Sequence, residues 1–155
     1  MSSHDSAQAA NAGRLIAAAG RQVCVYEEGA GPPVVVIVAG AGDRADSWLP
    51  VRHQVAASRR VVSYDRAGIG ASDNSPPATV DRYLAELGAV IEAASPHGPV
   101  IPLGHSLGGL IARLYQQAQP DRVNALVLLD STLSGSPMTG ASGRASWPRR
   151  SPPGC

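Results

Sequence analysis

Residues 100–118, with the sequence VIPLGHSLGGLIARLYQQA, decide the fold of this chain of 155 residues. A short apolar run leads into Gly104-His105-Ser106-Leu107-Gly108, which matches G-x-S-x-G, and apolar residues then recur with helical spacing. A serine between a strand and a helix sits on a strained turn, and its hydroxyl projects above the sheet. The flanking glycines are needed because a side chain there would clash with the neighbouring strand and helix. The pattern predicts either a reactive Ser106 or a glycine-rich connection without chemistry.

On both sides of this stretch, strand and helix patterns alternate. Val34 to Val38 is an unbroken β-branched run, which is typical of a strand buried on both faces, and Thr79 can cap an amphipathic helix. Such alternation predicts a parallel sheet covered by helices on both faces. Residues 21–38, which come first, are expected to form an antiparallel hairpin. The predicted strands are 34–38, 61–64, 99–103 and 125–129, and the predicted helices are 46–57, 80–91 and 107–118.

The composition is that of one globular domain. Hydrophobic residues make up 44% of the chain and charged residues 16%, which favours a packed core over disorder. The formal net charge is +1 and no basic face emerges, so nucleic acid is not expected as a partner. The longest apolar stretch, residues 34–39, is far shorter than the roughly 20 residues that span a bilayer, so no membrane partner is expected.

The two cysteines, Cys24 and Cys155, lie far apart in the chain. Their spacing fits neither a disulfide framework nor a zinc site, so no metal is expected. The first residues also lack a basic segment followed by an apolar one, which is the pattern of a secretory leader. We therefore expect a cytoplasmic protein.

Three segments, in this order along the chain, resemble the α/β-hydrolase superfamily of the serine hydrolase type. Residues 36–42 (VIVAGAG), followed by Trp48, resemble the strand and loop that supply half of the family's oxyanion hole. Residues 64–73 (YDRAGIGASD) resemble the loop after its fourth strand, and residues 104–109 (GHSLGG) resemble its nucleophile elbow. The resemblance runs from about residue 21 to residue 131.

The resemblance implies roles for three residues. Ser106 would be the nucleophile, and the backbone N–H groups of Ala41 and Leu107 would form the oxyanion hole. Where the family usually has His-Gly, this sequence has Ala39-Gly40, which affects the packing of that loop but not its backbone donors. The resemblance implies no metal and no cofactor. A serine at position 106, where the epoxide and haloalkane branches need an aspartate, favours acyl transfer.

A serine nucleophile needs a base, and the base needs an orienting acid. In this family the acid and then the histidine follow the nucleophile. Asp130 ends a predicted strand and is a candidate acid; the alternative is an aspartate that caps the following turn. None of the histidines follows Ser106, so no base histidine is found. The four histidines are His4, His53, His97 and His105.

The implied fold class is α/β, an α/β-hydrolase fold that lacks its C-terminal strands and helices and has a mostly parallel sheet flanked by helices. We expect an N-terminal arm over residues 1–20 (loose, or a short helix), a partial α/β-hydrolase domain over 21–133, and a disordered or out-of-frame tail over 134–155. The chain is then a truncation, a fragment or the product of a shifted reading frame. The implied activity is hydrolysis of a small-molecule, ester-like substrate, and we expect it to be absent or crippled in this chain.

Two other functions stay open at this point. Gly40 to Ala45 fits G-x-G-x-x-A after a buried strand, and Asp65 lies 20 residues further on. That is the pattern of a dinucleotide-binding, Rossmann-like domain, in which the acid holds a ribose. The hairpin expected before the glycine loop and the serine turn count against it. The other alternative is a non-catalytic binding protein of hydrolase descent.

The last predicted strand is apolar on both faces. Residues 125–129 (ALVLL) would be buried in a complete sheet. Left uncovered at a sheet edge, they predict self-association, because exposed apolar edges pair with other chains.

Overall fold

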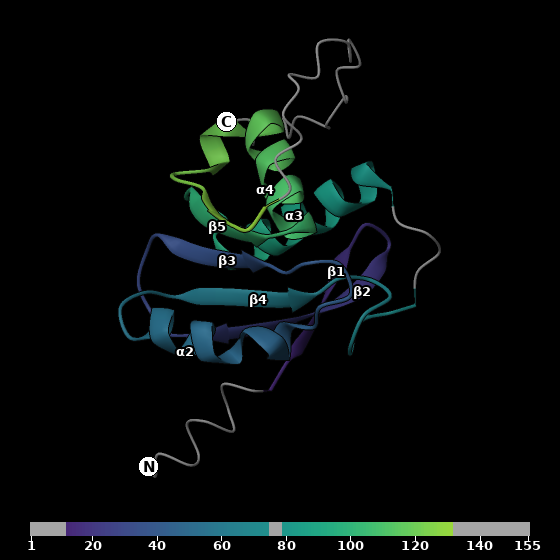
Figure 1. The fold of residues 1–155 in the computed structure, drawn as a ribbon, viewed down its shortest axis with the longest axis horizontal. Coiled ribbons are helices and arrows are strands. Elements are labelled where there is room, and N and C mark those ends of the chain that lie inside the picture. Colours follow the sequence, from purple (N-terminus) through teal and green to yellow (C-terminus); the bar gives the residue numbers. More distant parts are fainter. Residues whose placement is uncertain (1–11, 75–78, 132–155) are drawn as a thin grey trace, which may run out of the picture.

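The computed structural model describes residues 12–74 and 79–131, which form a sheet with the strand order β1-β2-β4-β3-β5-β6 (Figure 1). β3 lies between β4 and β5, and β3 to β6 all run parallel, whereas β1 and β2 are antiparallel to their neighbours. The strands are β1 Arg14–Ala18, β2 Arg21–Glu28, β3 Val34–Val38, β4 Val61–Asp65, β5 Val100–His105 and β6 Val127–Leu129. The helices are η1 Ala45–Trp48, α2 Leu49–Ala56, α3 Val80–Ala94, α4 Leu107–Ala118 and η2 Pro120–Arg122. The expected mostly parallel sheet flanked by helices is confirmed.

Helices cover both faces of the sheet, as Figure 1 shows: α2 lies on one face, and α3 and α4 lie on the other. The larger core packs apolar residues of α3 and α4, such as Ile91 and Ile111, against Val36 of β3. The smaller core packs Trp48 against Ile37 on the opposite face. Every residue of β3 and β4 is buried, because these central strands are covered on both faces.

The N-terminal segment differs from the expectation of a loose arm or short helix over residues 1–20. Residues 14–18 form β1, which pairs with β2 through the register Ile16↔Val23. Ala19 and Gly20, both with positive φ (52° and 77°), form the two-residue turn that joins these strands. Residues 1–11 and the expected tail 134–155 lie outside the described residues, and the three-region division stays a prediction.

The expected hairpin over residues 21–38 is wrong. β2 pairs with β4 through the register Tyr26↔Ser63, and β3 lies on the far side of β4. The turn over residues 29–33 therefore connects two strands that are not neighbours. Strand partners depend on packing across the sheet, which local alternation does not report.

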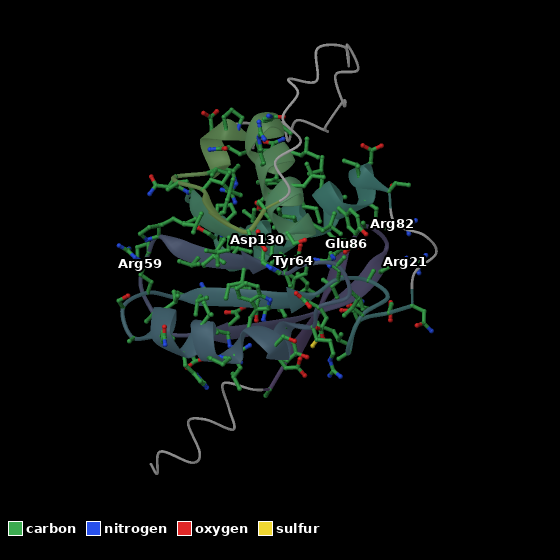
Figure 2. The ribbon with its side chains drawn as sticks, viewed as in Figure 1. Arg21, Arg59, Tyr64, Arg82, Glu86 and Asp130 are labelled. Atoms are coloured by element: carbon green, nitrogen blue, oxygen red, sulfur yellow. The ribbon has the colours of Figure 1, made fainter. Side chains whose placement is uncertain are left out.

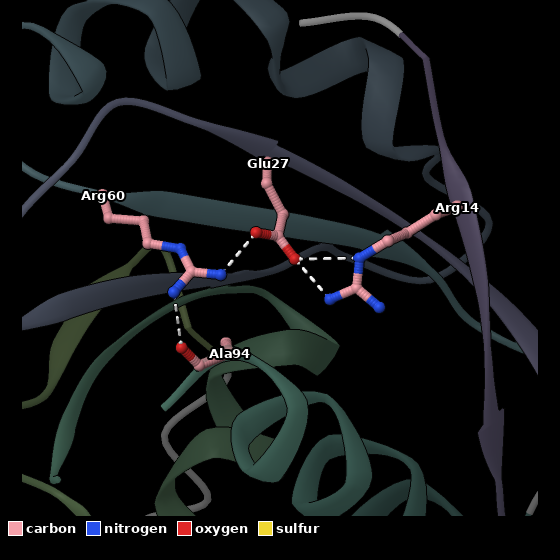
Figure 3. A network of polar contacts seen from close by, with 4 residues as sticks. All are labelled: Arg14, Glu27, Arg60 and Ala94. Carbon is pink, nitrogen blue, oxygen red and sulfur yellow. Dashed lines mark hydrogen bonds and ion pairs between the residues drawn. The ribbon is translucent and has the colours of Figure 1, made fainter. Parts of the chain in front are cut away.

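A charged network joins the two antiparallel strands to the rest of the fold (Figure 3). Arg14 of β1 donates to Glu27 of β2 from Nε at 3.2 Å and from Nη2 at 2.5 Å. Arg60 donates to the other oxygen of Glu27 at 2.5 Å and to the carbonyl of Ala94, at the end of α3, at 3.0 Å. Burial by itself would raise the pKa of the Glu27 carboxyl, but hydrogen bonds from Arg60 and Arg14 outweigh it and lower this pKa.

Glu27→Gln is expected to lower the free energy of unfolding by about 1 kcal/mol at pH 7, since the ion pairs are partly exposed. Because folding lowers the pKa of Glu27, its contribution is full above the unfolded pKa and is lost as the pH falls through the folded pKa. Urea unfolding at pH 7 and pH 3 measures both values. Glu92→Gln, which removes a more exposed carboxyl 3.6 Å from Arg122, is the control and should change little. An equal loss for Glu27→Gln at both pH values would contradict the prediction.

The end strand β6 is apolar and open to solvent. The exposed fractions of Val127, Leu128 and Leu129 are 39%, 36% and 40%, and β6 is the last strand in the order of the described sheet. This is the edge position expected from the sequence.

We predict that the chain of 155 residues self-associates through this edge and that Leu128→Lys weakens the association, because a charge on an edge strand opposes pairing. Light scattering after size-exclusion chromatography measures the mass. Leu15→Lys changes an equally apolar, exposed position on the opposite edge strand, β1, and serves as the control. A monodisperse monomer of the unchanged chain, or dispersal by Leu15→Lys alone, would show the prediction to be wrong.

Candidate active site

Ser106 lies between β5 and α4 in a backbone conformation that L-residues rarely adopt, with φ 50° and ψ −118°. Its N–H donates to the carbonyl of Leu129 at 3.3 Å, and its carbonyl accepts from Gly109 at 3.0 Å. The side chain makes no capping hydrogen bond to α4. The turn therefore holds the backbone of Ser106 on both sides while it leaves the hydroxyl outside the helix.

Glycines allow this turn to pack tightly. A Cβ on Gly104 would lie 2.5 Å from the Cα of Gly109, and a Cβ on Gly108 would collide with the carbonyl oxygen of Val38. These are the collisions expected from the G-x-S-x-G pattern. The first turn of α4 consequently rests directly on the carboxyl ends of β3 and β5.

The loop after β3 lies beside the serine turn. A Cβ on Gly40 would lie 2.9 Å from both the Nδ1 of His105 and the Oδ2 of Asp43. These two side chains are 3.6 Å apart, and the His105 ring packs against Trp48 with ring centroids 5.5 Å apart. His105, which precedes Ser106, thus packs against the loop after β3, although its buried Nδ1 makes no hydrogen bond. Ala41, which follows Gly40 in this loop, is exposed.

Arg66, which follows β4, binds this loop and was not identified from the sequence. Its Nη1 donates to the carbonyl of Ala39 at 2.5 Å, and its Nη2 donates to the carbonyl of Gly40. The guanidinium also lies over the ring of Tyr83, 5.7 Å from its centroid. Arg66 stabilises the loop in which Ala39 replaces the family's usual histidine. The arginine of the D-R-A-G-I-G segment was the signal, but only contacts across the sheet reveal its target.

A buried carboxyl, Glu86 of α3, lies close to this arginine. It accepts the N–H of Ala67 at 3.2 Å, and Figure 2 shows it in the layer between α3 and the sheet. Burial raises the pKa of the Glu86 carboxyl, and the Ala67 N–H and the positive charge of Arg66 oppose the rise. Glu86 thereby secures the start of the loop that follows β4.

Asp65 uses both carboxylate oxygens inside the protein. Oδ1 accepts the N–H of Ala45 at 2.7 Å, and Oδ2 accepts the N–H of Ala71 at 3.0 Å and the hydroxyl of Tyr26 at 3.2 Å. A Cβ on Gly70 would collide with this carboxylate. The alternative in which Asp65 holds a ribose is therefore wrong. The carboxylate is buried and connects two loops to β4.

Asp130 directly follows β6, one residue after the carbonyl that accepts the N–H of Ser106. It is exposed and has a positive φ of 42° (Figure 2 labels its position). Its neighbour Ser131 lies against α4, where a Cβ on Gly109 would collide with its hydroxyl. The chain thus passes over the first turn of α4 at this point.

No histidine is hydrogen-bonded to Ser106 among residues 12–74 and 79–131. His53 of α2 lies 2.6 Å from Glu28, His97 is exposed in the loop before β5, and His105 faces Asp43. His4 lies outside the described residues.

The described part of the chain holds no group of three or more His, Cys, Asp and Glu side chains placed to bind a metal ion. In the same part, each helix is too short or too polar to cross a membrane.

Residues 33–150 match the sequence family described as alpha/beta hydrolase fold. This chain belongs to the α/β-hydrolase family. The alternative of a separate dinucleotide-binding fold is thereby set aside.

Relatives with several named activities share this part of the α/β-hydrolase. Lipase LipV of Mycobacterium tuberculosis is 33% identical over 104 residues, which are 67% of this chain and 39% of the lipase. A thioesterase domain from the curacin biosynthetic pathway has a TM-score of 0.72 and 26% identity, covering 77% of this chain and 46% of that domain. An epoxide hydrolase mutant of Vigna radiata has a TM-score of 0.66 and 26% identity, covering 76% of this chain and 37% of that hydrolase. The chain spans less than half the length of each of these proteins.

The strain at Ser106 predicts a stability effect. A non-glycine residue in such a sparsely populated region costs on the order of 1–3 kcal/mol. Ser106→Gly is therefore expected to raise the free energy of unfolding by about 1 kcal/mol after the greater chain entropy of glycine is counted. Ser106→Ala keeps the strain and should leave stability nearly unchanged. Urea unfolding compares the three chains, and a Ser106→Gly chain that is less stable than Ser106→Ala would contradict the prediction.

Proposed function

We propose that this chain carries the nucleophile part of a serine hydrolase that acts on small-molecule, ester-like substrates. One observation carries the proposal: Ser106 occupies a strained turn (φ 50°) at the start of α4, with its hydroxyl free of the helix. Strain that persists at one half-buried polar side chain is typical of a functional position. A serine, in place of an aspartate, favours an acyl substrate over an epoxide.

The proposed chemistry uses the backbone around Ser106. The hydroxyl oxygen attacks the ester carbonyl, and the carbonyl oxygen becomes an oxyanion. The N–H of Leu107 is the first amide of α4, where helix amides have no acceptor within the helix and carry partial positive charge. The N–H of Ala41, in the loop after β3, is the second proposed donor. Two such donors typically stabilise the transition state by several kcal/mol.

The proton of the Ser106 hydroxyl needs a base as its acceptor. Asp130 is the proposed acid that would orient such a base. The sequence has no histidine after Ser106. His53 contacts Glu28, and the nearest carboxylate to the Nδ1 of His105 is that of Asp43, at 3.6 Å. We therefore infer that this chain by itself reacts slowly. A cytoplasmic location also belongs to this proposal. The competing function is a non-catalytic protein of hydrolase descent that binds a small molecule.

Labelling with a fluorophosphonate probe tests the proposal. We expect slow labelling of the unchanged chain, detected by intact mass spectrometry over hours, and no labelling of Ser106→Ala. Without an imidazole, only the oxyanion hole and binding assist the serine. Ser47, an exposed serine within η1, gives a matched control: Ser47→Ala should label like the unchanged chain.

Two outcomes contradict parts of this proposal. Rapid, stoichiometric labelling that depends on Ser106 would show that the chain already contains a base. Labelling that never reaches Ser106 would favour the non-catalytic binding protein.

A further inference from the structure

Arg66 makes a two-pronged contact with the backbone of the loop after β3. Its two terminal nitrogens donate to consecutive carbonyls, those of Ala39 and Gly40. The side chain is 3% exposed, and the ring of Tyr83 lies against the guanidinium. A planar fork of donors matches two neighbouring oxygens, which a single ammonium group does not. The contact therefore fixes two successive peptide planes.

The fixed plane of the Gly40–Ala41 peptide determines where the next donor points. In a trans peptide the N–H lies on the opposite side from the C=O. Because the Gly40 carbonyl faces Arg66, the N–H of Ala41 faces away from the guanidinium. A reversed peptide would lose a charge-assisted hydrogen bond and would bring an N–H dipole towards a buried cation.

The strand order places the serine turn on that opposite side. Arg66 follows β4 and Ser106 follows β5, and these two strands flank β3 on opposite sides. Gly40 is also in close contact with the ring of His105, the residue before Ser106. The end of β5, where Ser106 lies, is therefore on the side of β3 opposite to the end of β4.

We propose that Arg66 is a positioning residue that orients the N–H of Ala41 towards the oxyanion formed at Ser106. This inference rests on the proposed function for its chemistry, but the orientation itself can be measured independently. Arg66 touches neither substrate nor the reacting atoms. It acts through the peptide that it holds.

Arg66→Lys tests the proposal with two measurements. The residual dipolar coupling of the Ala41 N–H, recorded by NMR, reports the direction of this bond without any reaction. The rate of fluorophosphonate labelling at Ser106 reports its use. We expect the coupling to change and the labelling rate to fall at least about 10-fold. This is less than the fall in rate that follows complete removal of one oxyanion-hole donor. Couplings in β3, β5 and α4 should stay unchanged.

Arg122→Lys is a matched control. Arg122 also donates to two carbonyls, those of Gly98 at 3.1 Å and Ser95 at 2.7 Å, but in the loop before β5. It should leave both the Ala41 coupling and the labelling rate unchanged. If Arg66→Lys does not unfold cooperatively, Tyr83→Leu removes the ring that supports the guanidinium, and it should change both measurements in the same direction by less.

The outcomes separate this inference from the proposed function. An unchanged Ala41 coupling in Arg66→Lys overturns the orienting role. A changed coupling with an unchanged labelling rate overturns the link to the oxyanion. An unchanged chain that is never labelled at Ser106 contradicts the proposed function, and the coupling alone then decides whether Arg66 orients the peptide.

Discussion

The first turn of α4 packs directly against the carboxyl ends of β3 and β5, and the geometry around Ser106 depends on this close approach. Gly104 and Gly108 have no room for a Cβ, because backbone atoms of α4 and β3 occupy that space. The helix can begin so near the sheet only if the residue between them takes an unusual conformation. Ser106 does so, and backbone hydrogen bonds to Leu129 and Gly109 hold it there. Packing elsewhere in the sheet thus maintains local strain at this one residue.

Charged groups at the same edge of the sheet act on the backbone more than on one another. Asp65 accepts N–H groups of Ala45 and Ala71, Arg66 donates to two carbonyls of the loop after β3, and Glu86 accepts the N–H of Ala67. A buried charge is costly unless hydrogen bonds satisfy it, so each of these side chains holds its loop in one arrangement. The loops after β3 and β4 are therefore positioned by buried charge.

This arrangement separates two parts of the proposed reaction. The described residues offer a hydroxyl and backbone donors, which depend only on the turn and on the loop after β3. Proton transfer needs a further side chain, and the contacts of His53 and His105 are with Glu28 and Asp43. The named relatives, a lipase, a thioesterase and an epoxide hydrolase, show that this scaffold serves different chemistry. In the proposed reaction, Ser106 and its surroundings set the class of chemistry, and residues elsewhere complete it.

Local patterns in the sequence determined the elements that carry the site. The apolar run at 34–38 became β3, the helical spacing at 107–118 became α4, and the serine between strand and helix took the expected strained turn. These features follow from periodicity and from glycine sterics, which act between residues close in the chain. The boundaries of α3 and β5 differed from prediction by up to three residues, because helix and strand ends depend on their neighbours.

Only the tertiary structure decided which strands are neighbours and what the buried charges bind. β1 was missed because Leu15 to Ala18 carry a weak pattern, and its pairing with β2 stabilises it. β2 pairs with β4 and not with β3, so the expected hairpin was wrong. Asp65 had the spacing of a ribose ligand and proved to be an internal acceptor, and Arg66 reached a loop 26 residues earlier in the chain. Periodicity reports which residues are buried, whereas the identity of their partners is set by packing between segments that are far apart in sequence.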